Sequence, residues 1–576
     1  MEDTHFDTVV IGSGYGGSAT AYRLAEAGLR VCLLERGKAY PPGSFPRTPR
    51  EMAANFWDPS EGFHGLFDLW SFTAMEAVVA SGLGGGSLIN ASVMLRMDER
   101  WFVRETSDGG HQDWPVTRAD LDPSYDRVER VIGLQTYPLD RAPYDRTRKT
   151  VELREAANRR GLDWRLVPLA VTFAGPGRDP VPGEAIAERP NLHGQPRSTC
   201  RLVAECDLGC NFGSKNSLDY TFLSAAPKDK LTIRCRCEVR SFEPVDNGFS
   251  VSYVHHQQSA EGKKTDTRCL PLTTITAHCL VVSAGTFGTT YLLLRNRDAF
   301  PNLSPTLGSR FSGNGDFLSF VLRARSRAGG EQVPRILDPN FGPVITSAVR
   351  IPDYADGGRQ RGLYVEDAGY PQFAQWMIDD NAVALAARVL RFTLRRAWAR
   401  FTRTAKSSVG SQLSSALSKG LFTATSLPLL GMGRDVPDGR MFLRGENLDL
   451  DWKLRASLAY YRNVNATMQR IAEAMGGRHL PSPLWWLNLL ITAHPLGGVP
   501  MGRHPGEGVV DAHGRVFGHP GLSIADGSVL PGPVGANPSL TIAALADRFA
   551  ETTIEECRRR RNGRRPTPRP APRSGP

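Results

Sequence analysis

No stretch of this 576-residue chain approaches the roughly 18 consecutive apolar residues that a membrane-spanning helix needs. The first residues, "MEDTHFDTVVIGSGYGG", are acidic and lead at once into an apolar run, unlike the positively charged start of an export signal. Cysteine is scarce, with nine in the whole chain, which indicates reduced thiols rather than a disulfide framework. The sequence therefore predicts a cytoplasmic protein and disfavours the integral membrane and disulfide-rich secreted classes.

The few cysteines also lack the spacing of a metal site or an iron–sulfur cluster. Cys200, Cys206 and Cys210 lie in "CRLVAECDLGCNFGSKN", and their intervals match no ferredoxin pattern. Three such ligands hold a three-iron cluster at most, so we interpret the segment as a structural loop and predict no metal. Whether these cysteines bind anything is left open, because an electron-transfer dehydrogenase is an alternative.

Apolar residues are almost absent from the end of the chain, "CRRRRNGRRPTPRPAPRSGP". A Pro/Arg-rich segment of this kind cannot bury enough apolar surface to fold alone, so residues 557–576 are predicted to form a disordered basic tail. The tail carries much of the net charge of +11. Its role is open, and no nucleic acid partner is expected.

What the chain does contain is enough apolar sequence for a large core. Hydrophobic residues make up 41% and charged residues 22% of a length too great for one ordinary domain. The 58 glycines and 41 prolines indicate many turns and long connections. This balance is typical of a large cofactor enzyme.

The clearest local pattern lies near the beginning, in "FDTVVIGSGYGGSATAYRLAEAGLRVCLLERG". Residues 6–11 are a short apolar run of strand type, residues 18–27 have helical character, and "RVCLLE" is a second buried strand. Gly12, Gly14 and Gly17 stand between the first strand and the helix in G-x-G-x-x-G spacing. This order predicts a βαβ unit that binds a dinucleotide.

Each glycine of this motif has a mechanical reason. Gly12 allows the tight turn, Gly14 lets a pyrophosphate approach the backbone, and Gly17 lets the helix pack against the strand. The N–H groups at the start of the helix attract the phosphates. Glu35, at the end of the second strand, is placed to bind an adenosine ribose, and an acid there disfavours the 2′-phosphate of NADP. FAD and NAD both remain.

A second glycine-rich segment, "SGLGGGSLINASVMLR", begins at Ser81. Its three consecutive glycines, Gly84 to Gly86, give a backbone that can lie flat against a ligand. Apolar residues resume directly after them, so we interpret the segment as part of an ordered interior rather than as a flexible loop.

Six segments in chain order resemble the glucose–methanol–choline (GMC) oxidoreductases, and within that family the cholesterol oxidase branch. They are "VVIGSGYGGSATAYRLAEAG", "GLGGGSLINASVM", "GSKNSLDYTFL", "VVSAGTFGTTYLLLR", "HPLGG" and "IADGSVLPGPVGANPSLTIAALADR". The resemblance covers most of the chain and implies an α/β fold. This fold has a Rossmann-like FAD-binding domain of the p-hydroxybenzoate hydroxylase type and an α+β substrate domain whose antiparallel sheet roofs the flavin. It also implies FAD held without a covalent link.

The resemblance further implies which residues contact the cofactor. The two glycine segments and Glu35 are expected along the ADP half and the flavin, and the backbone of Val239 at the adenine. Asp526 is expected near the ribityl chain, and the helix after Pro538 at the pyrimidine edge of the flavin, where its partial positive charge suits a reduced, anionic ring. The full set is Gly12, Gly14, Tyr15, Gly16, Gly17, Glu35, Gly84, Gly85, Gly86, Ser87, Asn90, Val93, Val239, Asp526, Gly527, Asn537 and Pro538.

Two positions depart from the family pattern. Val93 stands where the family often has methionine, close to the flavin ring, so the redox potential or the substrate fit is expected to differ. Val499 stands where the cholesterol oxidases often have cysteine.

Oxidation of an alcohol removes a proton from oxygen and a hydride from carbon, and in the family flavin N5 accepts the hydride. His494, in "HPLGG", and Asn537, in "GANPSLT", match the family's active-site histidine and its partner asparagine. The proline and glycines after His494 exclude a helix or a central strand. The imidazole is therefore predicted on an irregular, tightly turning backbone.

Glu366, in "GLYVEDAGYP", is the third candidate catalytic residue. Cholesterol oxidases use a buried glutamate to move a proton within the steroid after oxidation, which shifts its double bond from Δ5 to Δ4. A glutamate that faces an apolar pocket has the raised pKa that such a shuttle needs. The alternative is a solvated acidic turn formed by Glu366 and Asp367.

These patterns divide the chain into interleaved domains. The FAD-binding domain is predicted to comprise residues 1–44, 216–318 and 487–556. The substrate-binding domain is predicted to comprise residues 45–215 and 319–486, with the flavin-contacting glycine loop carried by residues 45–120. Residues 382–403 alternate apolar and arginine side chains, as in a helix that lies on an anionic membrane, although packing on its own domain is the simpler interpretation.

Together the patterns predict an FAD-dependent oxidoreductase that converts a bulky apolar secondary alcohol, such as the 3β-hydroxysteroid cholesterol, to a ketone. O2 is the expected electron acceptor. The alternatives are the same chemistry on another lipid or a sugar alcohol with a non-oxygen acceptor, an iron-containing dehydrogenase, and a lipid-binding protein with an inactive flavin fold.

Overall fold

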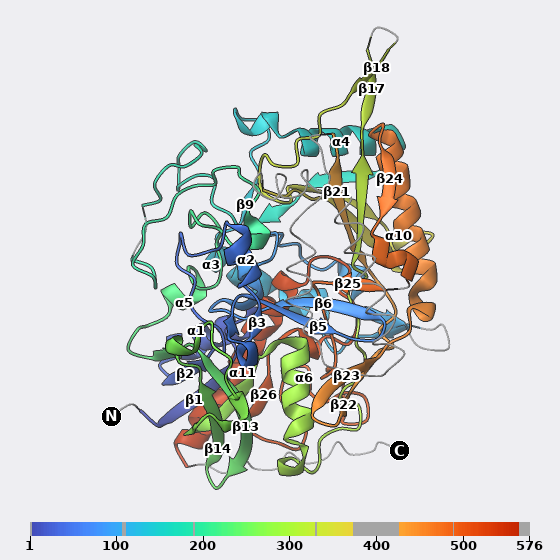
Figure 1. The fold of residues 1–576 in the computed structure, drawn as a ribbon. Helices are drawn as coiled ribbons and strands as arrows, with labels where there is room; N and C mark the ends of the chain where they lie inside the picture. The colour runs from blue at the N-terminus through green and yellow to red at the C-terminus, as the bar shows by residue number, and fades with distance from the viewer. Residues whose placement is uncertain are drawn as a thin grey trace.

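The computed structural model describes residues 3–105, 111–187, 190–328, 331–371, 425–487 and 489–563. They form two halves, each built on its own large β-sheet, with a small sheet between them (Figure 1). The predicted membrane-contacting segment, residues 382–403, lies outside the described residues. Within the described ranges, no helix has the length and apolar character needed to cross a bilayer.

The seven-stranded sheet of the lower half in Figure 1 is mostly parallel. β1 and β2 are buried along almost their whole length, which explains why they form continuous apolar runs in the sequence. β14 and β13 add an antiparallel end. The strands lie in the order β12 (Leu231–Arg234), β2 (Val31–Leu34), β1 (His5–Ile11), β15 (Leu272–Val282), β14 (Gly248–His255) and β13 (Cys237–Val245), and β26 (Leu522–Ile524) also pairs with β15.

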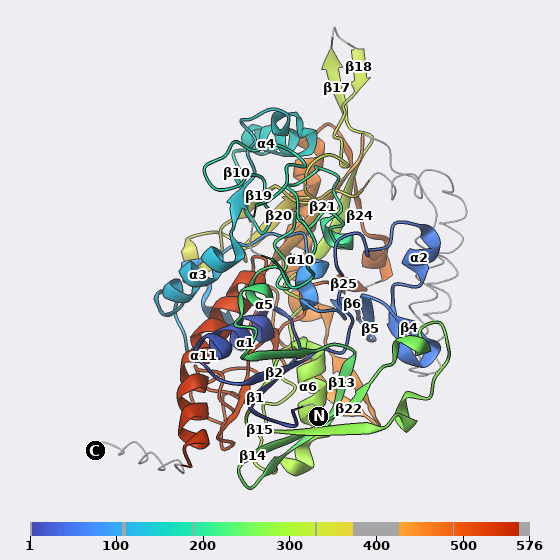
Figure 2. The same ribbon diagram turned by 90° about the vertical axis from the view of Figure 1, so that its left-hand side faces the viewer.

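Helices α1 (Tyr15–Glu26), α3 (Arg118–Ile132) and α11 (Ser539–Arg561) pack together beside this sheet, as Figure 2 shows. Asp547 of α11 is buried and pairs with Arg23 of α1 and, at 2.6 Å, with Arg127 of α3. One buried carboxylate thus joins all three helices. α6 (Gly285–Arg295) follows β15 and contacts the turn after β26.

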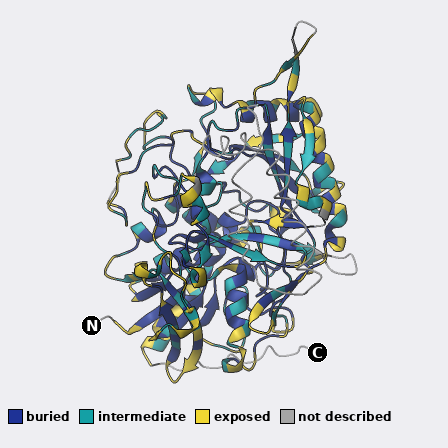
Figure 3. Ribbon diagram, viewed as in Figure 1, coloured by how far each residue is buried: buried dark blue, intermediate teal, exposed yellow. Residues whose placement is uncertain are grey.

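The six-stranded sheet of the upper half is antiparallel and is covered on one face by α10 (Leu454–Ala474). A Cβ on Gly431 would lie 2.6 Å from Val464 of α10, so the helix sits directly on the sheet. Figure 3 shows the buried stripe of α10 turned toward the strands. The strands lie in the order β10 (Asp163–Leu166), β19 (Ser347–Ile351), β20 (Leu363–Asp367), β21 (Leu427–Gly433), β16 (Phe317–Leu322) and β24 (Arg478–Pro481), with α4 (Arg148–Arg160) beside β10 and β19.

A three-stranded sheet lies between the two halves and consists of β25 (Leu490–Thr492), β6 (Met75–Ala80) and β5 (Phe67–Ser71). β25 leads directly into the "HPLGG" segment. Five two-stranded ribbons complete the described strands: β3 (Trp57–Asp58) with β4 (Phe63–His64), β7 (Val103–Glu105) with β8 (His111–Asp113), β9 (Gln135–Thr136) with β11 (Pro168–Leu169), β17 (Arg325–Ala328) with β18 (Glu331–Pro334), and β22 (Arg440–Arg444) with β23 (Asn447–Asp451). Two short helices, α2 (Pro49–Ala53) and α5 (Phe222–Ala225), lie in the connections.

Two predicted boundaries need correction. β16 begins at Phe317, before the predicted domain boundary at residue 319. α11 continues to Arg561, so residues 557–561 are helical rather than part of the tail. The reason is that Cys557 is buried, with its Sγ 3.2 Å from Thr8 Oγ1 of β1, which fixes this last part of the helix to the sheet.

Candidate active site

The first glycine turn connects β1 to α1 at the carboxyl ends of the parallel strands. Gly12 has a φ of 96°, and a Cβ there would lie 2.2 Å from the carbonyl oxygen of Ser283. A Cβ on Gly14, in contrast, would meet no atom within 4 Å. α1 begins at Tyr15 without a side-chain cap, so the N–H groups of its first turn remain available to a ligand.

Glu35 secures this turn from the end of β2. One carboxylate oxygen accepts hydrogen bonds from Ser13 N at 3.1 Å and from Ser13 Oγ at 2.5 Å. The other accepts a hydrogen bond from Gly37 N at 2.8 Å. These bonds fix the buried carboxylate at the edge of the sheet where an adenosine ribose is expected.

The second glycine segment lies against the first. Gly85 has a φ of 53°, and a Cβ on it would lie 2.6 Å from Gly14 Cα. A Cβ on Gly86 would meet no atom within 4 Å. Asn90 Nδ2 donates a hydrogen bond to the Tyr15 hydroxyl at 2.7 Å, which ties the segment to the start of α1. Two segments that are far apart in the sequence therefore border one open space.

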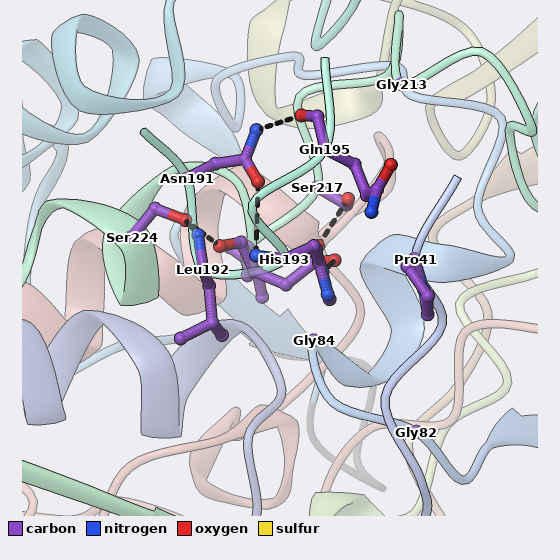
Figure 4. A network of polar contacts seen from close by, with 12 residues as sticks. Pro41, Gly82, Gly84, Asn191, Leu192, His193, Gln195, Gly213, Ser217 and Ser224 are labelled. Carbon is purple, nitrogen blue, oxygen red and sulfur yellow. Dashed lines mark hydrogen bonds and ion pairs between the residues drawn. The ribbon is translucent and has the colours of Figure 1, made fainter. Parts of the chain in front are cut away.

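A network of polar residues packs against the second glycine segment near Gly84 (Figure 4). Ser87 Oγ donates to the carbonyl oxygen of Gly84 at 2.7 Å. Next to it, the Asp219 carboxylate contacts His193 Nε2 at 2.6 Å and accepts a hydrogen bond from Ser217 Oγ at 2.5 Å. A Cβ on Gly84 would lie 3.4 Å from Asp219. Asp219 lies within the segment "GSKNSLDYTFL" that resembles the family, but no role was predicted for it or for His193.

Asp526 and Gly527 follow β26 at the same edge of the sheet. The Asp526 carboxylate accepts hydrogen bonds from Gly285 N at 2.9 Å, Thr289 Oγ1 at 2.5 Å and Ser528 N at 2.9 Å. Burial raises the pKa of Asp526, and these donors oppose the shift. The carboxylate therefore joins the start of α6 to the segment that faces the "HPLGG" loop.

The "HPLGG" segment is an irregular loop, as its proline and glycines predict. Gly497 and Gly498 have φ values of 82° and 102°. Gly497 N donates to the carbonyl oxygen of Gly527 at 3.0 Å, and Val499 N donates to that of Ser528 at 2.9 Å. The loop is thus fixed against the turn after β26.

His494 stands at the start of this loop and pairs with Asp316. Its Nδ1 lies 2.9 Å from one carboxylate oxygen of Asp316 and 3.1 Å from the other. Burial lowers the pKa of His494, but the charge and hydrogen bond of Asp316 and the charge of Glu366 outweigh burial, so the pKa is raised. Asp316 was not predicted from the sequence, because it lies just before β16 and carries no motif of its own.

Glu366 and Asn537 lie together beside this pair. Asn537 Nδ2 is 3.5 Å from Glu366 Oε2, and both residues are buried. Burial raises the pKa of Glu366 to about 8, although His494 and the Asn537 hydrogen bond lower it. Within the described part of the chain, Glu366 Oε1 and Asn537 Oδ1 have no hydrogen-bond partner. The structure therefore brings the three predicted catalytic residues together, and the predicted alternative of a solvated acidic turn at Glu366 is excluded.

The surroundings of Glu366 on the antiparallel sheet are apolar. Glu366 pairs in register with Leu430 of β21, which in turn pairs with Leu318 of β16. Directly opposed residues share one face of a sheet, so these three side chains form a row. This face is opposite to the one that α10 covers. Leu318 and Leu430 are only half-buried, which leaves an apolar surface beside a buried carboxyl group.

The remaining predicted residues occupy the same region or its edges. Val93 is buried at 2% exposure, Val239 lies in β13, and Pro538 precedes the first residue of α11. Cys200, Cys206 and Cys210 are free thiols. In the described ranges, no group of three His, Cys, Asp or Glu side chains is arranged to hold a metal ion.

Segments at both ends of the chain match models of known protein families. Residues 462–546 match the family model described as GMC oxidoreductase, and residues 7–179 match the model described as FAD dependent oxidoreductase. A cholesterol oxidase of Mycobacterium tuberculosis is 28% identical over 559 residues, which cover 95% of this chain and 90% of the relative. A cholesterol oxidase of Acinetobacter baumannii is 26% identical, with 96% of each chain covered. The chain belongs to the GMC oxidoreductases.

Other proteins similar to this GMC oxidoreductase are named for substrates other than cholesterol. A paromamine 6'-oxidase of Streptomyces fradiae is 26% identical, with 96% of this chain and 91% of the relative covered. The solved structure of a fungal aryl-alcohol oxidase superposes with a TM-score of 0.56 at 15% identity and covers 96% of this chain and all of its own. The predicted family and fold class are confirmed.

As a GMC oxidoreductase the protein binds FAD, and the residues present fit this cofactor. Gly14 and Gly86 border open space in which a Cβ meets no atom, and α1 points its uncapped end at that space. Asn537 Oδ1, which has no hydrogen-bond partner among the described residues, leaves a buried acceptor at the other end of the site. The prediction of FAD is confirmed, while the contacts of the individual residues with it stay predictions.

Proposed function

We propose that this GMC oxidoreductase oxidises a bulky apolar secondary alcohol to a ketone and that a 3β-hydroxysteroid such as cholesterol is its substrate. The observation that carries the proposal is the position of His494, Glu366 and Asn537 beside the half-buried leucines of the antiparallel sheet. A flat apolar alcohol covers such a surface and places its one hydroxyl group at the polar cluster. The cholesterol oxidases of Mycobacterium tuberculosis and Acinetobacter baumannii support this substrate class.

In this proposal His494 and Asn537 bind the hydroxyl group. Because Nδ1 is engaged by Asp316, the imidazole keeps Nε2 for the substrate and takes up the hydroxyl proton there. Asn537 presents its amide to the same oxygen and orients it. Bound FAD, held without a covalent link, supplies the hydride acceptor.

Glu366 then moves a proton within the product. Its pKa of about 8 lets the carboxyl group both take and return a proton near neutral pH. Asn537 holds one carboxyl oxygen. The other, Oε1, has no hydrogen-bond partner in the part of the chain that the structure describes and remains for the steroid. This step shifts the double bond from Δ5 to Δ4 and yields a conjugated enone.

O2 is proposed as the electron acceptor, with hydrogen peroxide as the second product. The alternative is a GMC alcohol dehydrogenase that acts on another lipid or a sugar alcohol with a non-oxygen acceptor. The relative named as a paromamine 6'-oxidase supports the part of this alternative that concerns another alcohol as the substrate.

The test uses the purified yellow holoenzyme and four alcohols: cholesterol, a long-chain primary alcohol, paromamine and a sugar. Under anaerobic conditions we expect cholesterol to bleach the flavin absorbance and the other three to leave it unchanged. Under air we expect hydrogen peroxide and a steroid enone. Bleaching by another alcohol but not by cholesterol contradicts the proposed substrate. Bleaching without peroxide formation under air contradicts the proposed acceptor.

A further inference from the structure

A short loop, residues 312–316, lies between the segments that carry His494 and Asn537, and we call it the clamp loop. Its first residue pairs with the "HPLGG" loop through the backbone, with Ser312 N 3.1 Å from the carbonyl oxygen of Leu496 and Leu496 N 2.9 Å from that of Ser312. Its last residue is Asp316, directly before β16.

Asp316 fixes the histidine side of the site. Besides His494 Nδ1, its carboxylate accepts hydrogen bonds from Thr492 Oγ1 at 3.0 Å and from Ala493 N at 2.8 Å. Thr492 Oγ1 also lies 3.0 Å from the carbonyl oxygen of Gly313, so its one proton is shared between the two acceptors. The backbone that leads into His494 and the imidazole itself are therefore bound by one side chain.

Asn314 fixes the asparagine side in the same way. Its side chain is fully buried and its φ is 52°, a left-handed conformation that asparagine tolerates better than most residues. Nδ2 donates to the carbonyl oxygen of Ala536 at 2.9 Å, and Oδ1 accepts from Gly535 N at 2.9 Å. These two residues directly precede Asn537, so the amide of Asn314 sets the backbone from which Asn537 projects.

The clamp loop is itself held by the substrate half. The buried carboxylate of Asp435 accepts hydrogen bonds from Ser312 Oγ at 2.5 Å and from Gly313 N at 3.1 Å. The hydroxyl of Tyr460 in α10 donates to the carbonyl oxygen of Gly315 at 2.8 Å. The loop therefore has little freedom to follow a movement of either catalytic segment.

We infer that Asn314 and Asp316 are positioning residues and that the clamp loop sets the Asn537 amide and the His494 imidazole relative to each other. The inference rests on the proposed roles of His494 and Asn537. Neither positioning residue needs to contact the substrate. Each acts through one catalytic residue, Asn314 through Asn537 and Asp316 through His494.

The first test needs no substrate. Hydrogen–deuterium exchange is measured on the FAD-loaded enzyme for the peptides that contain residues 533–538 and 490–496. In Asn314→Ala we expect about 10-fold faster exchange in residues 533–538. Asn296→Ala is the matched control, since Asn296 Nδ2 also donates to a carbonyl oxygen, that of Leu292, and its Oδ1 also accepts from a backbone N–H, that of Phe242. Equal exchange in Asn314→Ala and the wild type overturns the inference.

The second test is kinetic and uses a double-mutant cycle with cholesterol as the substrate. We expect Asn314→Ala to lower kcat by about 10²-fold with KM within about threefold, because a small displacement of a reacting group is costly while binding is kept. In the Asn537→Ala background the same change should lower kcat less than about threefold. An equal loss in both backgrounds shows a general structural effect and overturns the inference. If His494→Ala and Asn537→Ala both keep the wild-type kcat, the proposed function is contradicted together with the inference. If both lose activity, a failed double-mutant cycle contradicts the inference alone.

Discussion

His494 Nδ1 lies 2.9 Å from a carboxylate oxygen of Asp316. Asp316 directly precedes β16 of the six-stranded sheet, whereas His494 follows β25 of the small sheet between the halves. The carboxylate is held in place by Thr492 and Ala493. A fixed carboxylate determines which ring nitrogen carries the proton and which one faces the substrate. The carboxylate also raises the pKa of the imidazole and therefore the pH above which the imidazole can act as a base.

Replacement of Asp316 by asparagine should lower the pKa of His494. Burial lowers this pKa and Asp316 raises it, so the variant keeps burial and loses the opposing charge. The neutral imidazole is the proposed base, and the acid limb of the kcat/KM profile should therefore move to lower pH by about 1 unit. We also expect kcat to fall by about 10-fold or more, because an amide accepts the Nδ1 proton less well. Profiles of both enzymes across the neutral range decide this, and coincident acid limbs contradict it.

The same change should alter the pH dependence of stability. The pKa of His494 in the folded protein is above its ordinary value of 6.5. The contribution of the pair to stability is then complete below about pH 6.5 and is lost as the pH rises through the raised pKa. Urea denaturation at several pH values should show this loss in the wild type and a smaller one in Asp316→Asn.

Glu366→Gln should separate the two proposed reactions. Glutamine keeps the shape and the contact with Asn537 but cannot carry a proton, so enone formation should fall by about 10²-fold while flavin reduction stays within about 10-fold. The unconjugated ketone should then accumulate, which chromatography of the products detects. In the wild type, enone formation should rise as the pH increases through about 8, the pKa of Glu366, because the carboxylate takes the first proton. Conjugated product from the variant at the wild-type rate rules out the assigned role.

The contribution of Glu366 to the pH dependence of wild-type stability should have the opposite sign to that of a typical carboxyl group, whose pKa is lowered on folding. The folded-state pKa of Glu366 is raised from 4.5 to about 8, so the folded protein binds more protons than the unfolded chain between these values. The free energy of unfolding should therefore fall as the pH rises through this window. Glu366→Gln should lack this part of the decline.

The sequence was informative wherever a local pattern has a local cause. The G-x-G-x-x-G turn, the "HPLGG" loop and the helix after Pro538 were predictable, because glycine, proline and helical periodicity act over a few residues. Glu366 was predictable only through family resemblance. Its burial depends on β16, β19 and β21, and no local pattern reports that.

Asp316, Asn314 and Asp435 could not be predicted because their roles exist only in three dimensions. Asp316 is 178 residues from His494 and Asn314 is 222 residues from Ala536. The segment "FSGNGDF" has the composition of an ordinary turn before a strand. The one available signal was an asparagine and an aspartate around glycines at the start of a buried strand, which many turns share.

Gly85→Ala should weaken FAD binding. The new methyl group would lie 2.6 Å from Gly14 Cα, and the two glycine segments would have to separate. Gly161→Ala is the control, because its φ of 63° is similar to the 53° of Gly85 but a Cβ there meets no atom within 4 Å. Both variants bear about 1–2 kcal/mol of left-handed strain, and only Gly85→Ala should also lose cofactor. The ratio of flavin to protein absorbance after gel filtration measures this, and equal flavin content in the two variants contradicts the predicted contact.

The buried pair of Lys149 and Asp367 should be essential to the strand that carries Glu366. Lys149 Nζ lies 3.0 Å from the carbonyl oxygen of Val344 and 3.1 Å from the Asp367 carboxylate, and both side chains are fully buried. Burial lowers the pKa of Lys149, and Asp367 opposes the shift. Lys149→Met leaves a buried carboxylate without its counter-charge. We therefore expect a loss of about 3–5 kcal/mol in the free energy of unfolding.

An exposed ion pair on the same helix provides the control for the buried pair. Arg159 of α4 lies 3.5 Å from Glu155, with side chains 43% and 49% exposed, and Arg159→Met should cost less than about 0.5 kcal/mol. The double variant Lys149→Met/Asp367→Asn should recover part of the lost free energy of unfolding. Its neutral amide replaces the buried carboxylate that lost its counter-charge. If Lys149→Met costs no more than Arg159→Met, the pair does not hold β20 in place. If the double variant is as unstable as the sum of its single changes, the uncompensated charge is not the cause.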